Sequence, residues 1–156
     1  MNFQTPPDIC NYMSSFITPD YRNPNPSILE PTPGEGNLVN ALVTRGIITA
    51  PIDFFDLPDD SRFDWIVSNP PFSPMVLGYK ILDKCMTMSD NLIFLMPWLT
   101  LINSEKRTKK IFDFGLVSVT HLPRNVFPGS RVQTCILEMK KDYKGQTIFK
   151  NYVRIK

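Results

Sequence analysis

Four consecutive residues, Asn69-Pro70-Pro71-Phe72, could hold a planar amine and turn it into a nucleophile. They directly follow the apolar run 63–68, which is typical of a strand. The Asn69 side-chain oxygen and the Pro70 carbonyl both accept hydrogen bonds, and proline has no N–H to compete for them. Two acceptors on one amine leave its lone pair free to attack, while Phe72 offers a flat face for a base. The alternative is a proline-rich turn, since the chain has 15 prolines.

A glycine turn provides a second candidate site. The short apolar segment 27–30 predicts a strand that ends on the Glu30 carboxylate, and Gly34 and Gly36 follow it before a helical pattern. Glycine lets a ligand approach the backbone closely, and a carboxylate suits a ligand with an ammonium or another cationic group. The alternative is an ordinary strand-to-helix turn without a ligand, because tight turns commonly contain glycine.

Composition indicates one globular domain over residues 1–156, with 42% hydrophobic residues. No apolar run reaches membrane-spanning length, and the N-terminus lacks the pattern of a signal peptide. The three cysteines are odd in number and widely spaced, which favours a reducing, cytoplasmic location over disulfides or a zinc site. The net charge of +2 permits a polyanionic partner without requiring one.

The spacing of apolar residues predicts alternating helices and strands. Helices are expected to start at Thr5-Pro6 and at Ser73-Pro74, with Thr5 and Ser73 as capping residues, and to span 38–45 and 104–114. Strands are expected over 27–30, 47–52, 63–68, 91–96, 117–121, 132–139 and, at an edge, 147–155. This alternation predicts an α/β fold with a mostly parallel, doubly wound sheet. No helix separates 117–121 from 132–139, so we expect a terminal antiparallel hairpin there.

In a sheet of this kind, ligands bind at the carboxyl ends of the strands. Several candidate residues fall at predicted carboxyl ends: Glu30, Gly34, Gly36, Asp53, Asn69 and Pro70. Residues that are scattered along the sequence are therefore expected to meet at one edge of the sheet.

The segments together resemble the N6-adenine DNA methyltransferases that use S-adenosylmethionine. Residues 3–6 are similar to the family's N-terminal motif, 29–36 to its glycine-rich cofactor motif, 53–55 to its Asp-Phe element and 69–72 to its catalytic motif. The resemblance covers residues 3–139. It implies a Rossmann-like class I methyltransferase fold, S-adenosylmethionine as cofactor and, as substrate, a DNA adenine flipped out of the duplex.

The resemblance also assigns roles to the matched residues. The implied cofactor-binding residues are Phe3, Thr5, Pro6, Glu30, Pro31, Gly34, Gly36, Asp53 and Phe54. The implied catalytic residues are Asn69, Pro70, Pro71 and Phe72. Asp53 would meet the cofactor's adenine amine and Phe54 would pack on its ring. The implied transfer is direct and requires neither a metal ion nor a histidine base.

The chain departs from the family between its glycine motif and its catalytic motif. The family usually has two strands there with a helix between them, whereas only one predicted strand fits between Arg45 and Phe63. The first family strand normally ends on an acid that binds the ribose hydroxyls. Only Asp53 and Asp56 lie in range here, so we expect a shortened strand–helix unit and weak cofactor binding.

No residues are left after Phe72 for a target-recognition domain. We therefore expect sequence readout from short loops such as 122–131, or from a partner subunit. Arg124 and Arg131 in this loop are candidate phosphate contacts, whereas the charged segment 105–110 is typical of a solvated helix face. The small size is compatible with a phage or mobile-element enzyme.

Three single residues have other interpretations, and three rival functions are possible. We interpret His121 as structural, Trp65 as a core residue, and Trp98, which follows Pro97 at a strand's carboxyl end, as a candidate pocket residue. The rival functions are methylation of a protein glutamine amide, methylation of adenine in RNA, and a non-catalytic subunit with a methyltransferase fold. Enzymes that methylate glutamine have a similar motif, Asn-Pro-Pro-Tyr, and an extra N-terminal helical domain. Phe72 and the short N-terminal segment therefore count against that function.

Overall fold

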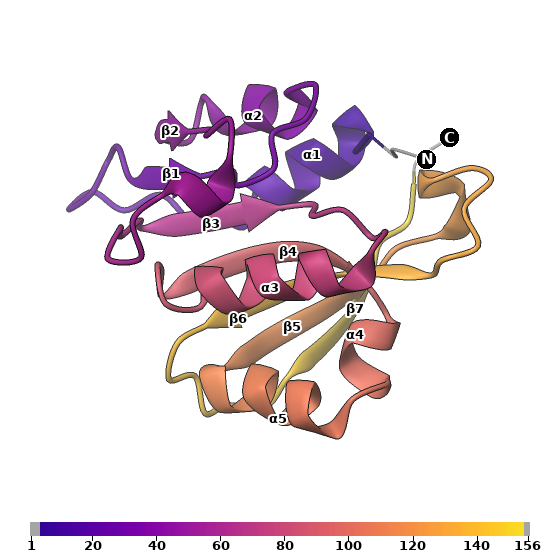
Figure 1. Ribbon diagram of the computed structural model, residues 1–156. Coiled ribbons are helices and arrows are strands. Elements are labelled where there is room, and N and C mark those ends of the chain that lie inside the picture. Colours follow the sequence, from indigo (N-terminus) through magenta and orange to yellow (C-terminus); the bar gives the residue numbers. More distant parts are fainter. Residues whose placement is uncertain (1–3, 155–156) are drawn as a thin grey trace.

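The computed structural model describes residues 4–154, and Figure 1 shows a sheet covered by helices on both faces. The strands are β1 (Ser27–Leu29), β2 (Ile47–Thr49), β3 (Trp65–Ser68), β4 (Asn91–Pro97), β5 (Leu116–His121), β6 (Thr134–Lys140) and β7 (Ile148–Asn151). The helices are α1 (Pro7–Ser14), α2 (Asn37–Leu42), α3 (Met75–Cys85), α4 (Leu99–Ile102) and α5 (Glu105–Phe114), with 3₁₀ turns η1 (Phe54–Asp56) and η2 (Arg124–Val126).

The strands described between residues 4 and 154 form one 7-stranded sheet in the order β2-β1-β3-β4-β6-β5-β7. Strands β2, β1, β3 and β4 run parallel, and β6 is antiparallel to both β4 and β5. The predicted α/β fold and the antiparallel β5–β6 hairpin are therefore confirmed. The last strand, β7, lies at the edge and pairs parallel to β5.

Two hydrophobic clusters cover the two faces of this sheet. Neighbouring strand residues point to opposite faces, so Ile66 packs in one cluster and Val67 in the other. Helices α3 and α5 pack on the first face, and α1 and α2 on the second (Figure 1). Strand β4 is buried from residue 92 to 97, as its apolar run predicted, because both of its faces are covered.

The segment between β2 and β3 contains only the turn η1. Every residue from 50 to 64 is described, and neither a second strand nor an α-helix is present among them, which confirms the shortened strand–helix unit. Strand β2 ends at Thr49 rather than at residue 52, since Pro51 cannot donate a ladder hydrogen bond. Because β2 is also the outermost strand on its side, the η1 turn has no strand beyond it.

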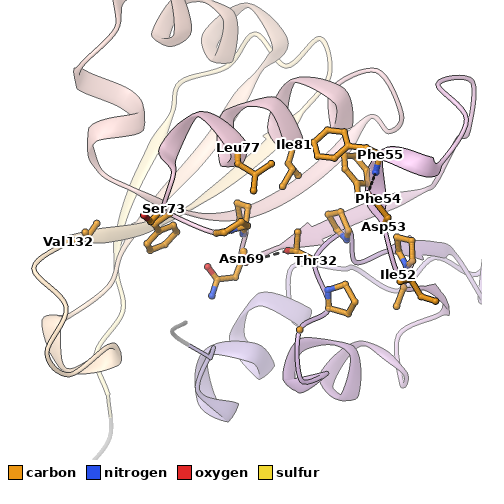
Figure 2. Close-up of a pocket in the computed structure, with 18 of the residues that line it drawn as sticks. Thr32, Ile52, Asp53, Phe54, Phe55, Asn69, Ser73, Leu77, Ile81 and Val132 are labelled. Carbon is orange, nitrogen blue, oxygen red and sulfur yellow. Dashed lines mark hydrogen bonds between the residues drawn. The ribbon is translucent and has the colours of Figure 1, made fainter. Parts of the chain in front are cut away.

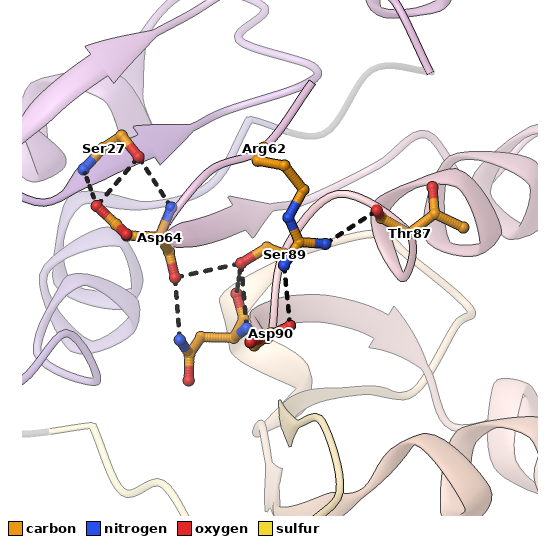
Figure 3. A network of polar contacts seen from close by, with 7 residues as sticks. Ser27, Arg62, Asp64, Thr87, Ser89 and Asp90 are labelled. Atoms are coloured by element: carbon orange, nitrogen blue, oxygen red, sulfur yellow. Dashed lines mark hydrogen bonds and ion pairs between the residues drawn. The ribbon is translucent and has the colours of Figure 1, made fainter. Parts of the chain in front are cut away.

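A polar network ties the amino ends of three neighbouring strands together (Figure 3). The Asp64 carboxylate, just before β3, accepts hydrogen bonds from the Ser27 backbone N–H at 2.8 Å and hydroxyl at 3.1 Å. The Asp64 backbone carbonyl accepts from Ser89 Oγ at 3.2 Å and Asn91 Nδ2 at 3.0 Å. The Ser27 N–H is the largest cause that lowers the pKa of Asp64. This network fixes the relative stagger of β1, β3 and β4, and with it the positions of their carboxyl ends.

The segment after β7 fastens α1 to the rest of the molecule. Arg154 donates from Nε and Nη2 to the two carboxylate oxygens of Asp8, at 2.9 and 2.8 Å, and from Nη1 to the Asn125 carbonyl at 2.8 Å. The Tyr152 hydroxyl donates to Asp8 at 3.2 Å. The hydrogen bond from Arg154 lowers the pKa of Asp8. Helix α1 is thus held by residues from the far end of the described chain.

Two helices begin differently from the prediction. Helix α1 starts at Pro7 after Pro6, and α3 starts at Met75, both without a side-chain cap. Neither Thr5 nor Ser73 therefore acts as a capping residue. Proline near a helix start removes an N–H that would need a partner, so the Thr5 side chain is free for another contact.

Candidate active site

A cleft of about 1210 Å³ opens at the carboxyl ends of β1 and β3. The order of the strands reverses between these two, which is where doubly wound sheets bind ligands. Eight residues predicted from the sequence line this cleft: Pro31, Gly34, Asp53, Phe54, Asn69, Pro70, Pro71 and Phe72. In the view of Figure 2, Asn69 and Thr32 lie in the middle, Ser73 and Val132 on one side, and Phe54 and Phe55 on the other.

A small polar cavity of about 40 Å³ adjoins the cleft. Thr5 and Glu30 line it, and it shares Thr32, Pro33, Gly34 and Asn69 with the larger cleft. Pro6 and Gly36 line neither space. Gly36 instead precedes α2 with a φ of 90°, a left-handed conformation that favours glycine. Phe3 lies outside the described residues.

Asn69 is held by its amide nitrogen, which leaves its oxygen available. Its Nδ2 donates to the Thr5 hydroxyl at 2.8 Å, and the side chain is only partly buried. Thr5 is itself 5% exposed and accepts at its carbonyl from Asn37 Nδ2 at 3.1 Å. The contact that replaces the predicted Thr5 cap therefore orients the candidate catalytic amide.

Thr32 connects the glycine turn to the candidate catalytic segment, a role that its residue type did not predict. Its hydroxyl lies 3.1 Å from Ser68 Oγ, 3.4 Å from the Asn69 carbonyl (Figure 2) and 3.5 Å from Glu30 Oε1. Its backbone N–H also donates to Glu30 at 2.8 Å. One side chain thus contacts both the end of β1 and the candidate catalytic segment after β3.

Glu30 is a buried acid whose protonation state depends on its surroundings. The residue is 2% exposed, and no ion pair found within residues 4–154 includes it. Burial raises the pKa of its carboxyl to about 8, against the lowering effect of the two hydrogen bonds from Thr32. A positively charged ligand group in the adjoining cavity would favour the carboxylate. The chemistry of this position therefore fits an ammonium.

The η1 turn carries the remaining predicted contacts. Asp53 is exposed and lines the cleft, and its Oδ1 accepts from the Phe55 N–H at 2.9 Å. Asp56 does not line the cleft. Phe54 is 3% exposed and belongs to the core, whereas Phe55 is 46% exposed and also faces the cleft. Ala50 and Pro51 follow β2, so no acid stands at the end of that strand.

The Pro-Pro segment packs closely on helix α3. A Cβ atom at Gly78 would lie 2.9 Å from the Pro71 carbonyl oxygen, which is closer than side chains pack. Pro70 is buried and Pro71 is exposed. Gly78 therefore lets the candidate catalytic segment sit against the helix, and a glycine inside a helical pattern is the sequence signal that could have predicted such an approach.

The hairpin loop between β5 and β6 borders the cleft. Ser130 and Val132 line it, and the exposed Arg131 stands between them. Arg124 is also exposed, in η2, and its guanidinium reaches the Gln133 side-chain oxygen at 2.6 and 3.2 Å when that amide is turned toward it. Both predicted phosphate contacts are therefore at the surface, and Arg131 is flanked by two residues that line the cleft.

Trp98, His121 and the charged segment 105–110 do not line this cleft. Trp98 Nε1 donates to His121 Nδ1 at 3.0 Å, and the Trp98 ring stacks on Phe149 with centroids 5.8 Å apart. On α5, Lys109 and Lys110 form ion pairs with exposed aspartates. Within residues 4–154, no group of His, Cys, Asp or Glu side chains could hold a metal ion. No helix in that part of the chain has the length and apolarity to cross a membrane.

Several solved structures share the fold of this chain. No protein-family model and no curated protein sequence matches the chain. A solved structure from Listeria monocytogenes, described as a candidate class I S-adenosylmethionine-dependent methyltransferase, matches with a TM-score of 0.74 and 17% identity. The match covers 95% of this chain and 65% of that one. The chain has the class I methyltransferase fold.

Two further solved structures share this methyltransferase fold. The type I restriction-modification methyltransferase subunit of Streptococcus thermophilus has a TM-score of 0.71 and 15% identity, over 96% of this chain and 47% of that one. A candidate RNA methyltransferase of Pyrococcus horikoshii has a TM-score of 0.60 and 16% identity, over 90% of this chain and 87% of that one. The chain thus spans about half the length of the restriction-modification subunit.

Proposed function

We propose that this chain transfers a methyl group from S-adenosylmethionine to the N6 amine of adenine in DNA. The observation that carries the proposal is the position of Asn69-Pro70-Pro71-Phe72. The tetrapeptide leaves β3 at the point where the strand order reverses, and it lines the same cleft as the glycine turn and the η1 turn. Amine acceptors and a candidate cofactor site therefore face one space.

The cofactor half of the proposal rests on the residues around Thr32 and η1. Glu30, beside the small polar cavity, would bind the cofactor's ammonium, and the open backbone at Gly34 admits the ligand. Asp53 would accept from the adenine amine, with Phe54 and Phe55 against the ring. When bound, S-adenosylmethionine supplies an electrophilic methyl group on a sulfonium.

The target half of the proposal rests on the acceptors of the catalytic segment. Because Asn69 Nδ2 is engaged by Thr5, its Oδ1 and the Pro70 carbonyl can accept the two hydrogens of the target amine. Phe72 stacks the base. These preorganised acceptors favour the positive charge that develops on the amine nitrogen. The proton leaves to water afterwards, so no histidine is needed.

DNA as substrate requires a base that has left the duplex. Arg131 is exposed between the cleft residues Ser130 and Val132, and Arg124 is exposed in the same loop. Both would contact phosphates on either side of the flipped adenine. Phosphate contacts carry no sequence information directly, so we propose that a partner subunit or a further recognition element supplies it. A type I restriction-modification methyltransferase subunit among the structural matches supports that arrangement.

The test is methyl transfer from labelled S-adenosylmethionine to separate acceptors: duplex DNA, single-stranded DNA, RNA of the same sequence, and a glutamine-containing peptide. We expect N6-methyladenine in DNA digests analysed by mass spectrometry. Asn69→Ala removes one proposed acceptor of the target amine. Asn40→Ala, on the exposed face of α2, is its matched control. Label found only in RNA or in the peptide would assign the rival substrate. Failure of the chain to bind S-adenosylmethionine in calorimetry would leave it as a non-catalytic subunit.

A further inference from the structure

The η1 turn carries cleft residues without a neighbouring strand to support it. It follows β2, which is the outermost strand on its side of the described sheet. The turn is also short, since only Phe54–Asp56 are helical. Its three cleft residues, Asp53, Phe54 and Phe55, would nevertheless have to hold a flat ring in one place.

The ammonium of Lys84, in the last turn of α3, contacts the η1 turn. Its Nζ donates to the backbone carbonyls of Leu57 at 2.9 Å, Phe54 at 3.4 Å and Phe55 at 3.5 Å. The same nitrogen lies 4.9 Å from the centre of the Phe54 ring and 5.7 Å from that of Phe55. The Lys84 side chain is only 14% exposed.

These contacts meet a need of the turn itself. The Phe54 carbonyl also accepts from the Leu57 N–H at 3.1 Å, but the last carbonyls of a helical turn lack a partner within it, and a cation near that end is favourable. An ammonium has three donors and no acceptor, which matches three converging carbonyls. Its position over two aromatic faces adds a cation–π attraction that disfavours rotation of the rings away from it. Asp59, 3.7 Å away, is 98% exposed and contributes little.

We propose that Lys84 is a positioning residue for the adenosine half of the cofactor, which it serves by ordering the η1 turn before the cofactor binds. This inference rests on the proposed function. Lys84 lies outside the residues that line the cleft and acts through Phe54, Phe55 and the turn backbone. Without it, binding would have to order the turn, and the affinity would fall by the cost of that ordering.

The experiment compares Lys84→Met with Lys80→Met. Methionine keeps the apolar stem and removes the donors, and Lys80 is an exposed lysine one turn earlier on the same helix, so both variants lose one charge. By calorimetry we expect Lys84→Met to weaken S-adenosylmethionine and the fragment 5′-methylthioadenosine by the same factor, about tenfold. The kcat at saturating cofactor should stay within about twofold of wild type. Lys80→Met should bind both ligands like wild type.

Hydrogen exchange provides a readout that needs no cofactor. In Lys84→Met, the N–H groups of Phe55 and Leu57 should exchange faster, while amides in β4 keep their protection. Lys84→Gln, which retains an uncharged –NH2 group with two donors, should exchange at rates between those of wild type and Lys84→Met. Unchanged affinity for both ligands, or an unchanged exchange rate in the turn, would overturn the proposal. If wild type binds no S-adenosylmethionine, the proposed function fails, and exchange still decides whether Lys84 orders the turn.

Discussion

The two ends of the cleft are built in different ways. At the proposed target end, the candidate catalytic segment leaves a central strand, packs on α3 at Gly78 and is tied to Thr5 and Thr32 by side-chain hydrogen bonds. At the adenosine end, the η1 turn follows an edge strand, and it is exposed at Asp53 and Phe55. The core of the sheet therefore supports the candidate catalytic segment, whereas the candidate adenosine contacts lie on a turn beside the outermost strand, a turn that Lys84 contacts.

The largest effect is expected at the target end. Asn69→Ala should lower kcat by about 100-fold or more, because it removes an acceptor aimed at the developing charge. The affinity for S-adenosylmethionine should change by less than about threefold, since Asn69 is assigned to the target amine and Glu30 and Asp53 to the cofactor. Single-turnover kinetics and calorimetry on the same preparation measure the two values. Turnover near that of Asn40→Ala would remove the catalytic assignment of the tetrapeptide.

The next effect concerns Glu30, which stands between the two ends. Its folded pKa of about 8 lies above the ordinary 4.5, so its contribution to stability is complete below pH 4.5 and is lost as the pH rises toward 8. Within that window, wild type should lose up to roughly 1.4 kcal/mol per pH unit relative to Glu30→Gln. Urea unfolding at several pH values tests this. Parallel curves for the two proteins would contradict it.

At the adenosine end the expected effect is smaller. Asp53→Ala should weaken S-adenosylmethionine about tenfold, because one hydrogen bond to a charged acceptor is lost. Asp56→Ala should have an effect of less than about twofold, since Asp56 does not line the cleft. Calorimetry with both variants decides between them. A loss of binding in Asp56→Ala alone would mean that the Asp-Phe element is wrongly aligned.

The smallest effect is expected at the loop beside the target end. Arg131→Ala should weaken binding of duplex DNA severalfold and reduce the salt slope by about 1. Lys144→Ala, an exposed cation in the loop between β6 and β7, is the control. Wild type should methylate many adenine contexts. Sequencing that finds one sharp motif of several base pairs would show that the loop reads bases.

Much of this arrangement could be predicted because it depends on local pattern. The apolar run of β4 and the order of strands and helices indicated the sheet, and the carboxyl-end rule then gathered Asn69, Asp53 and Gly34 into one cleft. Phe54 and Phe55 could not be told apart, since which ring is buried depends on how the turn meets α3. The interpretation of Thr5 as a cap was wrong for a related reason: a tertiary contact with Asn69 uses the hydroxyl.

The residues that sequence reasoning missed act across long separations in the chain. Thr32 is an ordinary turn residue by type, and only the fold brings its hydroxyl to Ser68 and to the Asn69 carbonyl. Lys84 reads as a surface residue near a helix end, yet it contacts a turn about 30 residues earlier in the chain. Such contacts follow from packing, which periodicity does not encode.

The hydrogen-bonded ion pair between Arg154 and Asp8 has a consequence for how the chain folds during its synthesis. Its partners are 146 positions apart, and α1, which it secures, follows directly after the Thr5 that holds Asn69. A growing chain can form the sheet strands around β1, β3 and β4 first. The contact between Arg154 and Asp8, however, can form only when nearly all described residues have left the ribosome. The candidate catalytic amide would gain this support only after Arg154 has emerged, so that nascent chains that stop short of Arg154 lack it.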